Sequence, residues 1–85
     1  MTGDGPRVVL LLFAGAREAA GTGRDELTGR TVGDVLAAAR TRYGAQFSAV
    51  LETSGVWRNG EPARPTDTLV DGDEVAVLPP VSGGA

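Results

Sequence analysis

The residues best suited to chemistry lie at the C-terminal end, which reads Val81-Ser82-Gly83-Gly84-Ala85. The chain has no histidine and no cysteine, so a Ser-His-Asp triad, a cysteine nucleophile and the common zinc sites are excluded. Gly83 and Gly84 lack a Cβ and could thread a channel too narrow for other residues. A partner could then join AMP to the terminal carboxylate, and sulfur attack on that acyl-adenylate would give a thiocarboxylate. The candidate chemistry therefore belongs to the chain end and depends on a partner.

The alternative interpretation of this end is a frayed terminus without function. Pro79-Pro80 precede it directly and end the last predicted strand, because proline supplies no backbone donor. A strand followed by two prolines would project the tail from the body of the domain. This context favours the functional interpretation.

Two other glycine motifs are weaker candidates. Asp71-Gly72-Asp73 shares residues with a calcium loop but lacks the later ligands and the closing glutamate, which favours a turn. Gly21-Thr22-Gly23 lacks the lysine and the following Ser/Thr of a phosphate loop. We therefore expect no metal and no cofactor bound to the chain itself.

Length and composition predict one small domain. A chain of 85 residues has room for one core, and a domain of this size buries only about 60% of its unfolded surface. Net charge −3 and scattered arginines argue against a nucleic-acid partner. No segment reaches the roughly 20 apolar residues of a membrane span, so we expect no membrane contact and a cytoplasmic location.

Acidic residues gather near the C-terminal third of the chain, at Asp67, Asp71, Asp73 and Glu74. They could form a solvated turn beside a strand. Alternatively, they could form an acidic edge that meets a basic partner surface.

The first half of the chain predicts a strand, a short helix, a second strand and a long helix. The segment 7–13, which is apolar after Arg7, favours a central strand buried on both faces. Residues 14–20 favour a short helix that ends at Gly21, and residues 24–28 a weak return strand. Thr31 and Asp34 have capping-box spacing, and an apolar stripe follows as far as Tyr43.

The second half predicts a short helix over 45–51, a hairpin and a last strand. Asn59-Gly60 is a strong hairpin signal because both turn positions need positive φ. Pro62 and Pro65 limit the returning arm to a short edge strand. Residues 74–78 read as a second good strand. Trp57 either covers one edge of the core or is an exposed interface anchor.

This order of elements predicts an α+β fold of the β-grasp type. One main helix would pack across a mixed sheet whose apolar first and last strands run side by side and parallel. We expect a disordered N-terminus over 1–6, the β-grasp domain over 7–81 and a flexible Gly-Gly tail over 82–85.

Three segments together resemble the MoaD branch of the MoaD/ThiS sulfur carriers, the branch that provides the small subunit of molybdopterin synthase. The segments are Leu12-Phe13-Ala14-Gly15-Ala16-Arg17-Glu18, Asp71-Gly72-Asp73-Glu74-Val75 and Leu78-Pro79-Pro80-Val81-Ser82-Gly83-Gly84. The resemblance covers about residues 7 to 84, in consistent order. It implies a ubiquitin-like β-grasp fold.

The resemblance also implies a carrier that is not catalytic alone. An E1-like adenylating enzyme would use ATP to activate the terminal glycine, which then becomes a thiocarboxylate. The tail would enter the large catalytic subunit of molybdopterin synthase, in a heterotetramer, and sulfur would pass to the molybdopterin precursor.

By motif matching, the resemblance assigns the sulfur to Gly84 and makes Gly83 its channel-threading neighbour. Phe13 and Arg17 match positions at the partner surface, although Phe13 could equally belong to the core and Arg17 could be a solvated charge. The stem of the inserted tail matches Pro79, Pro80, Val81 and Ser82.

The chain departs from the family pattern at Ala85, because that pattern ends at the second glycine. A protease could remove Ala85 before activation. Ala85 could instead be an added residue, or the carrier could work in another way.

The sulfur recipient and even the reactivity stay open at this point. Cysteine, thiolated tRNA, thiamine or a secondary metabolite could replace molybdopterin, although the Phe13 to Glu18 pattern disfavours the thiamine carriers. A non-reactive β-grasp module that binds partners through its sheet is the rival of a different class.

Overall fold

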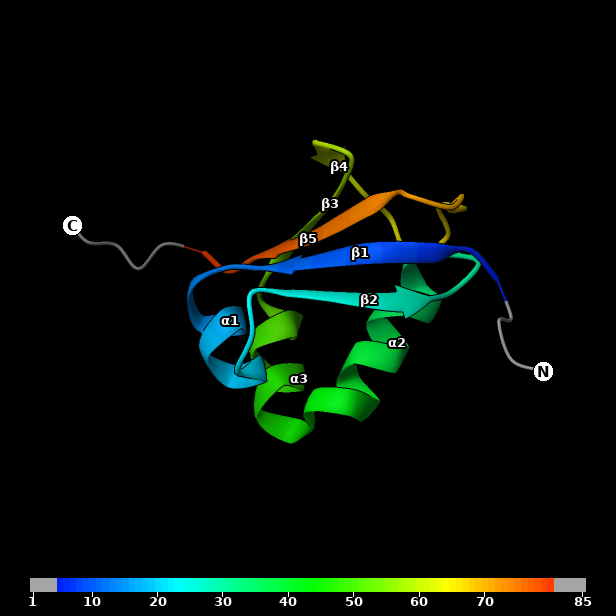
Figure 1. Cartoon of the computed structure of the whole chain (residues 1–85). Coiled ribbons are helices and arrows are strands. Elements are labelled where there is room, and N and C mark those ends of the chain that lie inside the picture. The colour runs from blue at the N-terminus through cyan, green and yellow to red at the C-terminus, as the bar shows by residue number, and fades with distance from the viewer. Residues whose placement is uncertain (1–4, 81–85) are drawn as a thin grey trace.

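A computed structural model describes residues 5–80 of the chain. In this range five strands form one sheet, and three helices lie together on one of its faces (Figure 1). The elements are β1 (Arg7–Leu12), α1 (Ala14–Ala20), β2 (Arg24–Thr28), α2 (Val32–Tyr43), α3 (Ala45–Glu52), β3 (Gly55–Arg58), β4 (Glu61–Pro62) and β5 (Glu74–Leu78). Their order and types confirm the sequence prediction.

The strand order across the sheet is β2-β1-β5-β3-β4. β1 and β5 are parallel neighbours, with Leu10 opposite Val75. β2 pairs antiparallel with β1, and β3 pairs antiparallel with β5. The parallel pairing of the first and last strands was predicted, because the helices between them provide the long connection that parallel strands need. This is the β-grasp arrangement.

Local signals set the main helix and the hairpin. The Thr31 hydroxyl accepts the Asp34 N–H at 3.1 Å, and the Asp34 carboxylate accepts the Thr31 N–H at 3.3 Å, which completes the capping box of α2. Between β3 and β4, Asn59 and Gly60 have φ of 52° and 85°. Both have the positive φ that a two-residue hairpin requires.

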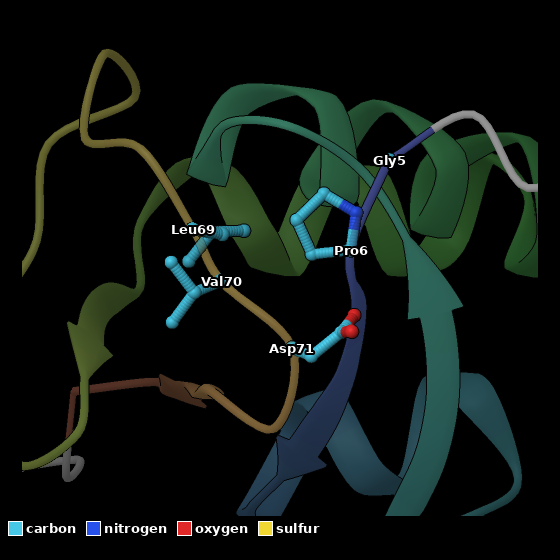
Figure 2. A pocket seen from close by; sticks show the side chains of 5 residues that line it. All are labelled: Gly5, Pro6, Leu69, Val70 and Asp71. Carbon is cyan, nitrogen blue, oxygen red and sulfur yellow. The ribbon is translucent and has the colours of Figure 1, made fainter.

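The segment before β1 is held to the body of the domain. The Pro6 carbonyl accepts the Gly29 N–H at 3.1 Å, and the Arg7 N–H donates to Asp71 Oδ1 at 2.8 Å. Figure 2 shows Pro6 beside Leu69 and Val70 around a shallow concavity. Because of the Pro6–Gly29 hydrogen bond, the disordered segment predicted over residues 1–6 does not extend to Pro6. Residues 1–4 of that prediction lie outside the described residues.

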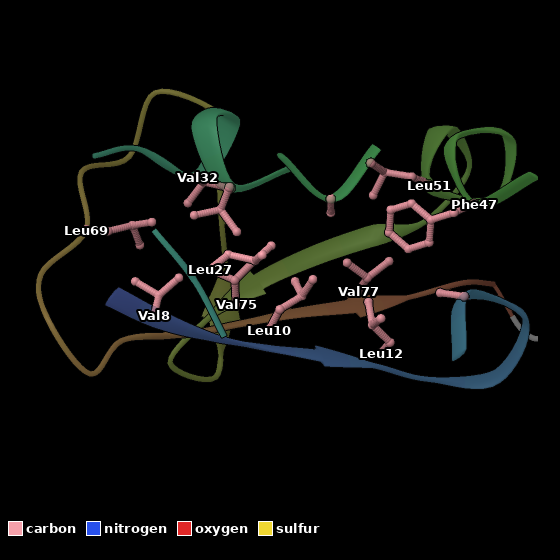
Figure 3. Packing of buried hydrophobic residues seen from close by; sticks show 13 residues of the cluster. Val8, Leu10, Leu12, Leu27, Val32, Phe47, Leu51, Leu69, Val75 and Val77 are labelled. Carbon is pink, nitrogen blue, oxygen red and sulfur yellow. The ribbon is translucent and has the colours of Figure 1, made fainter. Parts of the chain in front are cut away.

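The core lies between the sheet and the helices (Figure 3). Phe47 of α3 is fully buried there and meets the Tyr43 ring edge-on, at 5.2 Å between centroids. The buried apolar side chains are Val8, Leu10, Leu12, Ala16, Leu27, Val32, Val35, Ala39, Phe47, Leu51, Leu69, Val75 and Val77.

The prediction that β1 is buried on both faces was wrong. Val8, Leu10 and Leu12 are buried against the helices, whereas Val9 and Leu11 are only half-buried. Their side chains alternate along the strand, and the helices cover only one face of the sheet. We call the uncovered side the open face.

Candidate functional site at the end of the last strand

The candidate site is the end of the sheet where β5 leaves it. β1 and β5 are parallel, so the last residues of both strands lie at the same end. There the Phe13 N–H donates to the Val77 carbonyl at 3.2 Å, and Pro79 and Pro80 follow β5 directly. We call Phe13, α1 and residues 78–80 the exit end. The opposite end of the sheet, with Arg7 and residues 70–73, is the far end.

Phe13 lies on the surface of the exit end. Its side chain is 45% exposed, which excludes the core interpretation. Its carbonyl accepts the N–H groups of Ala16 and Arg17 at 3.0 and 3.3 Å and so starts α1. The next residue, Ala14, has φ of 49°, a conformation that costs a residue other than glycine about 1–3 kcal/mol. The chain is thus bent sharply just where the phenyl ring is left outside.

Arg17 is exposed one turn further along α1. Its side chain lies over Gly23, where a Cβ would come within 3.3 Å of Nε. Together with Ala14, Glu18 and Gly21 it lines a shallow concavity. Arg17 is linked to Phe13 through the backbone, because the Phe13 carbonyl accepts the Arg17 N–H, so both residues belong to the exit end.

The structure brings four of the predicted site residues to this end: Phe13, Arg17, Pro79 and Pro80. Pro79 is partly buried and Pro80 exposed. The predictions for Val81, Ser82, Gly83, Gly84 and Ala85 lie outside the described residues.

Trp57 and Leu78 add an apolar patch to the open face at this end. Trp57 is 37% exposed and Leu78 40%. In the register Trp57 stands opposite Ala76, and Gly55 stands opposite Leu78. A Cβ on Gly55 would lie 3.4 Å from Trp57 Nε1, so the indole leans over Gly55 toward Leu78. The two side chains are diagonal neighbours on one face.

Trp57 and Leu78 differ in how the sequence predicted them. For Trp57 the core-edge interpretation was wrong, because the open face has no covering layer in the described structure. Leu78 was not predicted as a site residue. The signal was present, because Val75 and Val77 on the core face leave Leu78 on the other face.

The predicted acidic cluster lies away from the exit end and is used in turns. Asp73 is only 8% exposed and accepts the Asn59 side-chain amide at 3.0 Å and the Val70 N–H at 2.9 Å. The hydrogen bond from Asn59, and then that from the Val70 N–H, lower the pKa of the Asp73 carboxyl. Asp71 accepts the Arg7 N–H, and Asp67 accepts the Arg64 N–H. The turn interpretation is therefore favoured over a free acidic edge.

Two further kinds of site are missing from residues 5–80. No group of three or more acidic, histidine or cysteine side chains in this range could hold a metal ion. Its helices include none that is both long and apolar enough to cross a membrane.

The mixed sheet, the helix layer on one face and the parallel central strands define a ubiquitin-like β-grasp protein. The ThiS family model matches residues 10–84, and the chain belongs to this family. This confirms the resemblance to the MoaD/ThiS sulfur carriers and makes the chain a small carrier protein of that type.

Two similar proteins and one solved structure show how far the likeness extends. A molybdopterin synthase sulfur carrier subunit of Chlamydomonas reinhardtii is 37% identical, over 92% of this chain and 99% of its own. Small archaeal modifier protein 1 of Haloferax volcanii is 42% identical, over 86% of this chain and 95% of its own. A crystal structure of SAMP1 from Haloferax volcanii superposes with a TM-score of 0.82 at 35% identity, covering 92% of this chain and 99% of that one.

Proposed function

We propose that this protein carries sulfur on Gly84 and delivers it as the small subunit of molybdopterin synthase. An E1-like partner transfers the AMP group of ATP to the Gly84 carboxylate and releases pyrophosphate. Sulfide released by a sulfur donor then attacks the acyl carbon, AMP leaves with the electron pair, and a thiocarboxylate remains. The tail enters the large synthase subunit, where the sulfur passes to the molybdopterin precursor. The 37% identity with the Chlamydomonas carrier subunit, over nearly its whole length, supports this recipient.

The geometry of the exit end is the observation that carries the proposal. The Phe13–Val77 hydrogen bond fixes the end of β5 against the end of β1. Around that point Phe13, Trp57 and Leu78 expose apolar surface. Exposed aromatic side chains are typical anchors of protein interfaces. A partner bound on this surface would hold the end of β5 in a fixed position. The residues after Leu78 would then enter the partner from that position, and such positioning of a reacting group increases the rate of a reaction.

Ala85 must be absent from the reactive form in this proposal. With Ala85 in place, the terminal carboxylate carries a methyl group next to it and lies one residue too far along the tail. Removal of Ala85 by a protease would restore the Gly83-Gly84 end. The proposal therefore predicts different reactivity for the two chain lengths.

A second candidate function is attachment to other proteins. The 42% identity with small archaeal modifier protein 1 favours it. Activation would be the same, but an amine of another protein would displace AMP and form an amide. Transfer of sulfur to other small recipients would also begin with the same activated glycine.

The test is an intact-mass measurement on the 85-residue chain and on a chain ending at Gly84. Each is incubated with ATP, an adenylating enzyme of the MoaD/ThiS type and a sulfur donor. We expect the Gly84-ended chain to exchange one oxygen for sulfur and the longer chain to remain unchanged. No modification of the Gly84-ended chain would contradict the carrier function. Addition of the large synthase subunit and the precursor then tests the recipient, because only the molybdopterin carrier should lose its sulfur there.

A further inference from the structure

All eight basic side chains of this sequence are arginines, so its 85 residues contain no lysine, and they contain no cysteine. We propose that this absence of side-chain amines and thiols protects the activated terminal glycine from attack by its own chain. The proposal rests on the proposed function, because it concerns the fate of the activated terminal glycine. It holds whether that glycine passes on sulfur or is attached to another protein.

An activated glycine is exposed to attack by amines. The nitrogen of a neutral amine bonds to the acyl carbon, the bond to AMP breaks, AMP leaves with the electron pair and a proton goes to water. Lysine has a pKa near 10.4 and always provides some neutral amine, whereas a guanidinium has a pKa of about 12.5 or more. The neutral nucleophile is thus about 100-fold scarcer on arginine. A chain with arginine in place of lysine is protected from this side reaction.

Ion pairing does not by itself require arginine at three of these positions, namely 7, 24 and 40. Among residues 5–80, Arg7 and Arg24 pair with Glu26, at 3.5 and 3.3 Å. Arg40 pairs with Glu52 at 3.9 Å. These arginine side chains are between 42% and 73% exposed, and exposed single pairs of this kind contribute little to stability with either cation. Lysine could therefore replace them at small cost to the fold.

The single tyrosine is also held in an unreactive form. The Tyr43 hydroxyl donates to the Asp25 carboxylate, which also accepts Arg42 Nη1 at 2.7 Å. Burial, and then the hydrogen bond to Asp25, raise the pKa of Tyr43 to about 12. The phenolate, which is the nucleophilic form, is thus suppressed near neutral pH.

The topology separates the chain entry from the chain exit. Because β1 and β5 are parallel, residues before Arg7 join the sheet at the far end, while those after Leu78 leave at the exit end. A six-residue strand such as β1 spans about 20 Å. The segment before Arg7 is therefore attached at the end of the sheet opposite the one from which Pro79 and Pro80 leave it.

The test supplies the activated end chemically and needs no partner enzyme. The chain ending at Gly84 is prepared as a C-terminal thioester by intein cleavage, in wild-type form and as R17K and R30K variants. Both arginines are exposed. Arg17 belongs to α1 at the exit end, where the chain continues past Pro80, and the six residues from Pro79 to Gly84 can span up to roughly 20 Å. Arg30 lies at the far end, where its carbonyl accepts the Leu69 N–H at 2.9 Å.

Self-acylation is read by intact mass, by denaturing electrophoresis and by mapping of the new amide. We expect wild-type protein to give only the hydrolysed acid, and R17K to give a cyclic product lighter than that acid by one water. A tethered amine has an effective concentration near 1 mM, so at about 10 μM protein R17K should react up to about 100-fold faster than R30K. Self-acylation of the wild type at the rate of R17K would overturn the proposal, as would an R17K variant no more reactive than wild type. Because no adenylating enzyme takes part, failure of the proposed function would appear only in the preceding assay.

Discussion

The two ends of the sheet differ in how their surface groups are used. At the far end polar groups are hydrogen-bonded within the chain. Asp73 accepts hydrogen bonds from Asn59 and Val70, and Asp71 accepts one from Arg7. At the exit end large apolar side chains are exposed, namely Phe13 at 45%, Leu78 at 40% and Trp57 at 37%. The polar groups of the far end therefore stabilise the fold, whereas the apolar side chains of the exit end are exposed and contribute little to it.

This contrast suggests that stability and function can be changed separately. Losing a hydrogen bond at the far end should destabilise the fold and spare the chemistry. A change at the exit end or in the tail should have the opposite effect. Val70 offers a useful exception, because it is apolar and 65% exposed but lies at the far end.

The largest effect is expected for G84V. A branched side chain at the reacting residue should not enter a channel that admits glycine. We expect at least a 100-fold loss of thiocarboxylate formation in the Gly84-ended chain, measured by intact mass, with a thermal midpoint within about 2 °C of wild type. G3V makes the same change at the other end of the chain and should leave activation intact. A large fall in the thermal midpoint of G84V would mean that the tail belongs to the fold.

The next effect is expected for D73A at the far end. The substitution leaves the Val70 N–H and the Asn59 amide without their acceptor, which should cost about 2–3 kcal/mol of the free energy of unfolding. Denaturant unfolding measures this loss, and activation of the surviving folded protein should be unchanged. A loss of activation at full stability would contradict the separation of the two ends.

The pH dependence of the same residue gives a sharper form of this prediction. Asp73 has a lowered pKa in the folded protein, so its charged form stabilises the fold above the unfolded pKa of about 3.9. That contribution is lost as pH falls from about 4 through the folded pKa. D73N keeps one acceptor oxygen without the charge, so its stability should fall less steeply below pH 4. Equal slopes for D73N and wild type would show that another carboxylate dominates.

The fold was predictable because its signals are local and agree with one another. Thr31 and Asp34 form the predicted capping box, and Asn59-Gly60 forms the predicted turn. The apolar strands at 7–12 and 74–78 pair as expected, because few other segments could fill the centre of a small sheet. These features depend on backbone conformation and on burial, and the residue types report both.

The candidate site was less predictable because exposure depends on packing between distant segments. The sequence did not decide whether Phe13 lies in the core or on the surface. That depends on whether a second layer covers the open face, and the described residues form no such layer. The same applies to Trp57, whose core-edge interpretation was wrong, and to Leu78, which was missed. These side chains are exposed because no helix covers them, and residue types alone do not show which surfaces the helices cover.

The smallest predicted effect compares matched apolar truncations at the two ends. W57A should weaken binding to the adenylating enzyme by about 10-fold or more, as expected for an exposed aromatic anchor. Its thermal midpoint should change little, because the indole lies outside the core. V70A removes a more exposed apolar side chain from the far end and should leave that affinity within about twofold. Calorimetric titration measures both variants. Equal weakening by V70A would place part of the partner surface at the far end and break the division between the two ends, whereas an unchanged affinity for W57A would limit the interface to Phe13, Leu78 and the tail.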